Sequence, residues 1–81
     1  MRHFLLMSTS GCHLCDEAVE LLVTGLDPQR HSVDEVDIAF DDALMERFGV
    51  RIPVLVDEAS GAELGWPFDA QGLQRFVASL E

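Results

Sequence analysis

The residues best suited to chemistry are Cys12 and Cys15, the two cysteines of the chain, which are spaced C-x-x-C. An apolar run and a small polar turn precede them, and a helical pattern follows. Residues three apart on a helix lie on the same side, so the two sulfurs can meet. Cys12 would start the helix, where unpaired backbone N–H groups and the helix dipole favour a thiolate. The arrangement therefore indicates thiol–disulfide chemistry.

Two other interpretations of the cysteine pair are open at this point. A zinc site needs about four ligands, and the histidines that could join the cysteines are His3, His13 and His31. Their spacing does not match the ligand pairs of common zinc modules. Free cysteines also serve simply as buried apolar surface, so two inert thiols are the other interpretation. The cysteines alone leave both alternatives standing beside the redox pair.

The surroundings of the two cysteines should differ along a helix that we predict over residues 12–23. One apolar face of this helix carries Leu14, Ala18, Leu21 and Leu22, and an overlapping face carries Cys15, Ala18, Val19, Leu22 and Leu26. Cys15 should therefore point towards the core, while Cys12 stays exposed at the tip. Disulfide exchange needs this combination of an exposed attacking thiol and a shielded resolving thiol.

Composition and charge limit the class of protein. The chain of 81 residues is expected to form one domain over residues 1–81, with 48% hydrophobic and 25% charged residues. Its net charge is −10 and its five basic residues are all arginine, which argues against nucleic acid and anionic membranes as partners. Neither a membrane span nor a signal peptide is indicated. We expect a cytoplasmic monomer without a metal or organic cofactor, a setting in which C-x-x-C is seldom a structural staple.

The order of predicted elements is β-α-β-α-β-β-α. The predicted strands cover residues 4–7, 31–38, 50–56 and 62–65, with Pro53 at the start of the third ladder. The second helix covers residues 43–48 after Asp41 or Asp42, and the last helix follows Asp69 as its cap. The first half is a βαβ unit with parallel strands, and the second half is a hairpin plus a helix. The fold class is therefore α/β in three layers, with one mixed sheet and helices on both faces.

With this order, the chain looks like a thioredoxin-fold protein and resembles the small glutaredoxin-like family. The matching stretches are residues 9–18 with the C-x-x-C pair, residues 36–38, and residues 48–55 with Ile52-Pro53. The resemblance implies a four-stranded mixed sheet and a cis bond between Ile52 and Pro53. It also implies that Cys12 is the nucleophile and Cys15 the resolving thiol. The loop before Pro53 should lie beside Cys12, where the Ile52 backbone can pair with a bound peptide or glutathione.

Several positions depart from the pattern of dithiol glutaredoxins. His13-Leu14 stands between the cysteines instead of Pro-Tyr, and the lysine that helps to hold glutathione is missing. Arg51-Ile52 replaces Thr-Val before the proline, and residues 65–69 replace Gly-Gly before the last helix. The substrate-binding candidates are thus His13, Arg51, Ile52, Pro53 and Asp69, with Arg47 as a further carboxylate binder. The structural alternatives are a solvated His13, arginines paired with surface acids, a core Ile52, a strand-start Pro53 and a purely capping Asp69.

The favoured function is a thiol–disulfide oxidoreductase that reduces protein disulfides or glutathione mixed disulfides, with glutathione as a co-substrate. The alternative is a non-catalytic thioredoxin-fold module that binds a protein partner, since the usual glutathione determinants are missing. A third hypothesis is a metal or iron–sulfur carrier that uses Cys12 with ligands from a second subunit or from glutathione.

Overall fold

The computed structural model describes residues 1–81. Its strands are β1 (Arg2–Ser8), β2 (His31–Asp37), β3 (Val54–Asp57) and β4 (Glu63–Gly65). Its helices are α1 (His13–Gly25), α2 (Asp42–Phe48) and α3 (Ala70–Leu80), with a short 3-10 turn, η1 (Ile38–Phe40), before α2. The predicted order of elements is confirmed. No helix among them has the length and apolar character needed to cross a bilayer.

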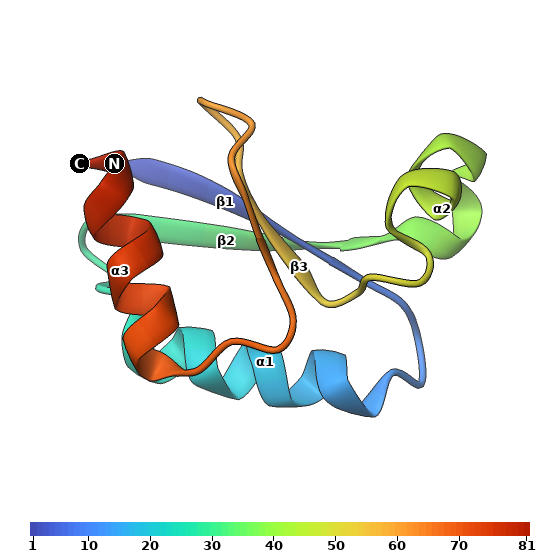
Figure 1. Ribbon diagram of the computed structural model, residues 1–81, viewed down its shortest axis with the longest axis horizontal. Helices are drawn as coiled ribbons and strands as arrows, with labels where there is room; N and C mark the ends of the chain where they lie inside the picture. The colour runs from blue at the N-terminus through green and yellow to red at the C-terminus, as the bar shows by residue number, and fades with distance from the viewer.

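The four strands form one mixed sheet in the order β2-β1-β3-β4 (Figure 1). Strand β2 runs parallel to β1, as a βαβ unit requires, whereas β3 is antiparallel to both β1 and β4. The predicted thioredoxin-like α/β architecture is therefore observed. Because β1 and β3 are central, their apolar side chains are covered on both faces.

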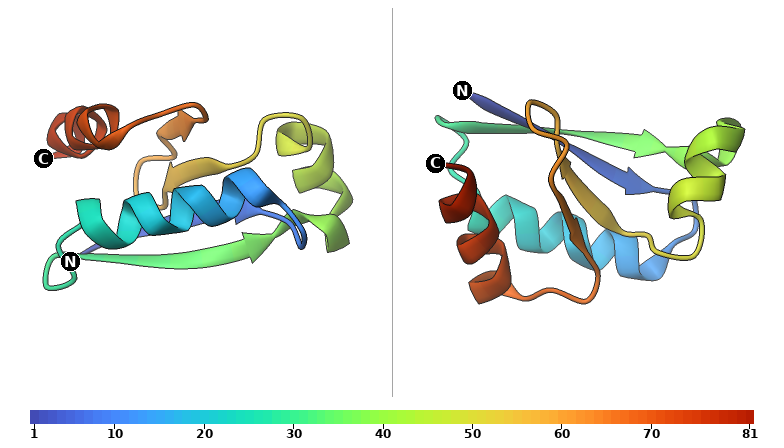
Figure 2. Two further views of the ribbon diagram at one scale, coloured as in Figure 1. Left: turned by 90° about the horizontal axis from the view of Figure 1, so that it is seen from below. Right: turned by 45° about the horizontal axis from the view of Figure 1, so that its top comes forward.

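Two hydrophobic clusters lie on opposite faces of the sheet. The larger joins β1 and β3 to α1 and α3, through Phe4, Leu6, Ala18, Leu22, Leu26, Leu55, Leu73 and Val77. The smaller packs η1 and α2 against the other face, through Met7, Ile38, Phe48, Val54 and Val56. Figure 2 shows α1 running along the sheet while α2 covers only one end of it. The larger cluster therefore holds α1 in its place on the sheet.

Close contact between α1 and α3 depends on Gly25, at the end of α1. A Cβ at this position would lie 2.6 Å from Leu73 Cδ2, closer than carbon atoms approach. The Gln74 side chain also donates to the Gly25 carbonyl at 2.8 Å. A larger residue at this position would therefore require the buried Leu73 side chain to move.

The third strand is shorter than the sequence predicts, because β3 begins at Val54 and not at residue 50. The backbone N–H groups of Arg51 and Ile52 donate to the Phe48 carbonyl at 2.8 and 3.1 Å. These residues therefore extend the turn that ends α2, and Val50 is fully exposed. An apolar run indicates burial, but it does not show where the hydrogen bonds of a preceding helix end.

Leu14 is also exposed, although the sequence places it on the apolar face of the first helix. The buried residues of α1 are Cys15, Ala18 and Leu22, which are three and four residues apart. Leu14 is about 100° around the helix from Cys15, so it points away from the sheet. An apolar side chain therefore lies on the surface between the two cysteines in the chain.

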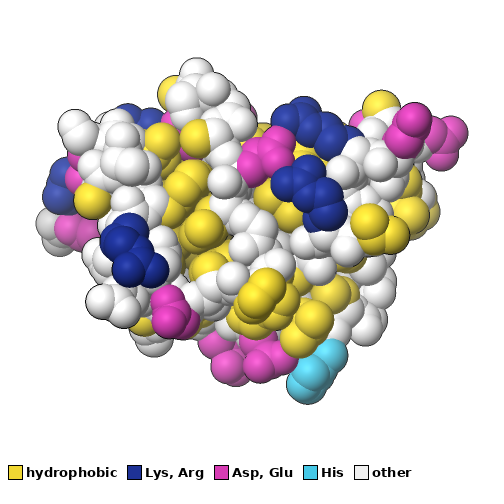
Figure 3. Space-filling view, viewed as in Figure 1, with side chains coloured by type: hydrophobic (Ala, Val, Ile, Leu, Met, Phe, Trp, Pro, Cys, Tyr) yellow, Lys and Arg dark blue, Asp and Glu magenta, His cyan; other side chains and the backbone are white.

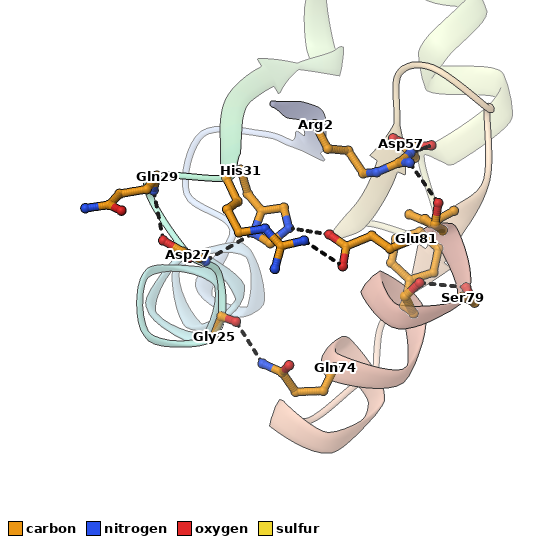
Figure 4. A network of polar contacts seen from close by, with 12 residues as sticks. Arg2, Gly25, Asp27, Gln29, His31, Asp57, Gln74, Ser79 and Glu81 are labelled. Atoms are coloured by element: carbon orange, nitrogen blue, oxygen red, sulfur yellow. Dashed lines mark hydrogen bonds and ion pairs between the residues drawn. The ribbon is translucent and has the colours of Figure 1, made fainter.

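Both ends of the chain meet beside β1 (Figure 1). The Arg2 guanidinium donates to Asp57 at 2.8 Å and to the Leu80 carbonyl at 2.8 Å (Figure 4). His31 Nε2 lies 3.1 Å from Glu81 Oε1. Burial opposes ionisation of Asp57, but hydrogen bonds from Ser60 and Arg2 outweigh it and hold its pKa below the ordinary value. This network fixes α3 to the sheet at the end opposite α2.

Candidate active site at the start of helix α1

Cys12 and Cys15 are joined as a disulfide, with their Cα atoms 5.2 Å apart. Cys12 is the N-cap of α1, and its sulfur accepts a hydrogen bond from the Cys15 backbone N–H at 3.2 Å. The strand β1 leads into the turn at residues 9–11, which brings Cys12 to the helix start. The sequence places Cys12 at the start of this helix, and the structure shows that Cys12 is its N-cap.

The two sulfurs have different surroundings. Cys15 is 1% exposed and lies on the buried face of α1 with Ala18 and Leu22, whereas Cys12 is partly exposed. The predicted difference is therefore present. A partner molecule can approach Cys12 from solvent, while Cys15 can be reached only through the bond that it shares with Cys12.

The loop before β3 lies beside the start of α1, as Figures 1 and 2 both show. Val54 pairs with Met7, so the antiparallel register brings Pro53 level with Ser8, at the end of β1 from which the cysteine loop departs. The Ile52–Pro53 peptide bond is cis, and Pro53 is buried. The sheet therefore brings the Ile52-Pro53 segment and the cysteine pair to the same end of the molecule.

The side chain and the backbone of Ile52 make different contacts. Its side chain packs against the smaller hydrophobic cluster. Its N–H is already used in the hydrogen bond to the Phe48 carbonyl at 3.1 Å, whereas its own carbonyl accepts no hydrogen bond from the protein. A bound chain can therefore use the Ile52 carbonyl without breaking an existing contact.

His13 points into solvent and is not in contact with the cysteine sulfurs. Its side chain is 90% exposed, and its Nε2 lies 4.0 Å from Glu17 Oε2, one turn further along α1. Neighbouring residues on a helix point in different directions, which explains why His13 and Cys12 diverge.

Arg51 and Arg47 share one carboxylate, that of Glu63 on β4. Arg51 donates to Glu63 Oε1 at 2.7 Å, and Arg47 binds Glu63 Oε2. Both guanidinium groups also lie over the Phe48 ring, at 5.4 and 4.8 Å from its centroid. The hydrogen bond from Arg51 is the main reason that the pKa of Glu63 lies below its ordinary value. Figure 3 shows an acidic side chain between two basic ones on this face.

Asp69 is the N-cap of α3, and its Oδ1 accepts the Gly72 N–H at 2.7 Å. Its side chain remains exposed beside Phe68 and Trp66 at the edge of a surface groove along α1. The capping role that the sequence suggested is thus present. The Asp69 carboxylate keeps an oxygen free on the surface.

A family model for the glutaredoxin-like domain (DUF836) matches residues 3–78, nearly the whole chain. The chain belongs to the glutaredoxin-like family. No curated protein matches it.

Solved structures agree with this assignment. An X-ray structure of the structural-genomics target protein XcR50 from X. campestris is 39% identical, with a TM-score of 0.83 over 94% of this chain and 96% of the other. The protein Ne2328 from Nitrosomonas europaea is 23% identical, with a TM-score of 0.75 over 93% of this chain and 89% of the other, and shows the same fold.

Two residues of this glutaredoxin-like site were not predicted from the sequence. Glu63 lies 12 residues from Arg51 in the chain, so only the pairing of β3 with β4 reveals that its carboxylate binds both arginines. Trp66 donates its backbone N–H to the Pro53 carbonyl at 3.1 Å, which places it next to the loop beside α1. A tryptophan directly after a short predicted strand was the available signal. The described residues gather no cluster of three metal-ligating side chains.

Proposed function

We propose that this glutaredoxin-like protein is a thiol–disulfide oxidoreductase in which Cys12 is the nucleophile and Cys15 the resolving thiol. The observation that carries the proposal is the cysteine pair itself: it caps a helix, it is joined as a disulfide, and only Cys12 reaches solvent. A purely structural disulfide at this position would contribute little stability, because a bond between residues three apart constrains the unfolded chain only weakly.

The reaction is an exchange of sulfur–sulfur bonds. In the reduced protein the Cys12 thiolate attacks a substrate disulfide, which forms a bond between Cys12 and one substrate sulfur and releases the other as a thiolate. The Cys15 thiolate then attacks Cys12 Sγ, closes the Cys12–Cys15 bond and releases the second substrate thiolate. The substrate gains two electrons and two protons, and the protein loses them. An external thiol reductant, such as two molecules of glutathione, restores the dithiol.

The helix start supports this chemistry electrostatically. The Cys15 N–H points at Cys12 Sγ, and a hydrogen bond of this kind strengthens when the sulfur becomes a thiolate. The exposed carboxylate of Asp16, in the first turn of α1, acts against the thiolate. The positive end of α1 therefore favours the reactive form, and Asp16 moderates that effect.

Substrate contacts come from the loop beside the cysteines. The free Ile52 carbonyl is an acceptor for the backbone of a bound peptide or of glutathione, and the buried Pro53 follows it in the chain. The proposed partners are therefore disulfide-containing proteins or glutathione mixed disulfides, in the cytoplasm and with the protein acting as a monomer.

Two serine variants test the proposed roles. Cys15→Ser should accumulate a stable mixed disulfide between Cys12 and a model disulfide, which intact-protein mass spectrometry detects as an adduct. Cys12→Ser should form no adduct and lose reductase activity, although it retains a cysteine in the same motif. Reductase activity that persists in Cys12→Ser would overturn the proposal.

The shared Glu63 carboxylate favours one second candidate, a module that binds a protein partner without turnover. Because Arg47 and Arg51 are already paired, the site offers few cations for the carboxylates of glutathione. This candidate predicts that a partner is retained equally by the wild type and by Cys12→Ser, with little reduction of small disulfides by either.

A further inference from the structure

A groove runs along α1 away from the cysteines, between this helix and the connection from β4 to α3. Its acidic wall comes from Glu17 and Glu20 and its aromatic wall from Trp66 and Phe68. It is an open depression with a volume of about 490 Å³. In the space-filling view, hydrophobic side chains lie directly beside acidic ones over this part of the molecule (Figure 3).

The lining of the groove has one sign of charge. Glu20 is exposed and makes no side-chain ion pair, and the neighbour of Glu17 is the solvated His13 at 4.0 Å. No arginine lines the groove. Arg75 borders the adjoining depression on the other side of Phe68. Free carboxylates on a molecule of net charge −10 attract cations and repel anions.

The aromatic wall adds a second kind of recognition. Trp66 and Phe68 pack edge to face, with their ring centroids 5.0 Å apart, and both remain partly exposed. The face of a tryptophan binds a guanidinium or ammonium group, and nearby carboxylates accept its hydrogen bonds. The two walls together suit the end of an arginine or lysine side chain better than an anion or a neutral group.

The groove lies within reach of a peptide held at Cys12. The Trp66 N–H binds the Pro53 carbonyl, so the aromatic wall begins at the loop beside the cysteines. Along α1, Glu17 and Glu20 lie about 8 and 12 Å from Cys12 at ~1.5 Å per residue. An extended peptide covers that distance in about two to four residues.

We infer that this groove selects the substrate of the proposed oxidoreductase: it binds a basic side chain located two to four residues from the reacting cysteine of a protein disulfide. The inference rests on the proposed function, since the groove acts on a chain that Cys12 has engaged. It names basic protein segments as the preferred substrate class. Glutathione has no arginine or lysine side chain, and its single ammonium group is outweighed by two carboxylates, so the acidic groove should disfavour it.

Three peptides with one cysteine each provide the test. Each cysteine carries a 2-thiopyridyl group, which the reduced protein releases as it forms the mixed disulfide with Cys12. The peptides differ only at the residue three positions from the cysteine, which is Arg, Ala or Glu. The wild type should react about fivefold faster with the Arg peptide than with the Ala peptide, and slowest with the Glu peptide. The preference should shrink below about twofold in 0.5 M salt.

A matched pair of variants separates the groove from the net charge. Glu20→Gln and Glu58→Gln each remove one negative charge from an exposed glutamate, but Glu58 lies beyond β3 at the far end of the sheet. Glu20→Gln should reduce the ratio of Arg to Ala rates about twofold, and Glu58→Gln should leave it unchanged.

The outcomes distinguish the inference from the proposed function. Equal rates for the Arg and Ala peptides, or an equal loss of preference in both variants, would overturn the inference while leaving the oxidoreductase intact. Failure of the Ala peptide to react in a Cys12-dependent way would overturn the proposed function and the inference with it.

Discussion

At the scale of single residues, two cysteines three positions apart differ because α1 has a buried and an exposed side. Cys15 lies with Ala18 against the sheet, and Cys12 caps the helix at its exposed tip. The chemistry proposed for each sulfur is a consequence of its position on the helix and not of its neighbours in sequence. His13 illustrates the point, since it adjoins Cys12 in the chain and yet points into solvent.

This difference predicts the order of alkylation. In the reduced protein, a limiting amount of iodoacetamide should modify Cys12 at least about tenfold faster than Cys15, because a reactive thiol must be accessible as well as ionised. Peptide mass mapping over time measures the two rates. Equal rates would show that Cys15 is not shielded once the disulfide opens.

The pairing of Glu63 with the two arginines should weaken the binding of anionic substrates at the site. Because hydrogen bonds from Arg51 and Arg47 lower the pKa of Glu63, its carboxylate stays ionised at neutral pH and occupies both arginines. Glu63→Gln should leave the arginines free for a carboxylate and raise the rate with oxidised glutathione about two- to fivefold, the range of an exposed ion pair.

The matched control for this change is Glu46→Gln, on the exposed side of α2. Rates with a neutral disulfide, measured for both variants, correct for general effects on Cys12. If Glu46→Gln accelerates the reaction with glutathione as much as Glu63→Gln does, the effect comes from net charge and not from the arginines.

At the scale of elements, side chains of aspartates start the two later helices. Asp41 accepts the Leu44 N–H at 3.1 Å at the start of α2, and Asp69 accepts the Gly72 N–H at the start of α3. Such caps satisfy donors that a helix leaves unpaired at its first turn. Because α3 closes the larger hydrophobic cluster through Leu73 and Val77, its cap also supports the core.

We predict that Asp69→Ala lowers the free energy of unfolding by about 1 kcal/mol, whereas Asp69→Asn costs much less, because asparagine also caps helices well. Urea denaturation followed by circular dichroism measures both. A large loss of stability in Asp69→Asn would show that the charge of Asp69, and not its hydrogen bond, is what stabilises α3.

The sequence predicts the elements and the caps because their signals are local. The C-x-x-C pair, the capping aspartates and the apolar runs each act within a few residues. The sequence does not predict that residues 50–52 continue the turn of α2, because that depends on which carbonyl their N–H groups reach. Nor does it predict the pairing of Glu63 with the arginines, which arises only when β4 aligns with β3. The part of the site that the sequence does not predict depends on contacts between segments that are distant in the chain.

At the scale of the whole molecule, charged side chains tie the ends of the chain together. Arg2 on β1 reaches Asp57 on β3 and the last turn of α3, while Arg30 and His31 reach Glu81. The hydrogen bond from His31 is the main reason that the pKa of Glu81 lies below its ordinary value. These contacts join the sheet to α3 at the end remote from the cysteines, so their loss should affect stability more than exchange.

Acid should weaken this network. A carboxylate whose pKa is lower in the folded state stabilises the protein at pH values above its ordinary pKa, which is 3.8 for Asp57. This contribution is lost as the pH falls below that value. The free energy of unfolding should therefore stay level from pH 7 to about pH 5 and fall below about pH 4.5. Urea titrations at stepped pH measure it.

Asp57→Asn identifies the contribution of this carboxylate. The variant should be less stable by about 2 kcal/mol at pH 7, because Asp57 accepts charge-assisted hydrogen bonds in a buried position. Its stability should also decline less steeply in acid than that of the wild type. Parallel curves for the two proteins would assign the acid sensitivity to other carboxylates.

A redox titration shows whether Cys12 and Cys15 form a reversible redox pair. The protein is equilibrated with glutathione buffers of stepped ratio, free thiols are alkylated, and the mass of each species is read. We predict a single two-electron transition between the dithiol and the Cys12–Cys15 disulfide, at a potential between roughly −270 and −120 mV. A protein that stays a dithiol at every ratio, or a disulfide that no ratio reduces, would contradict it.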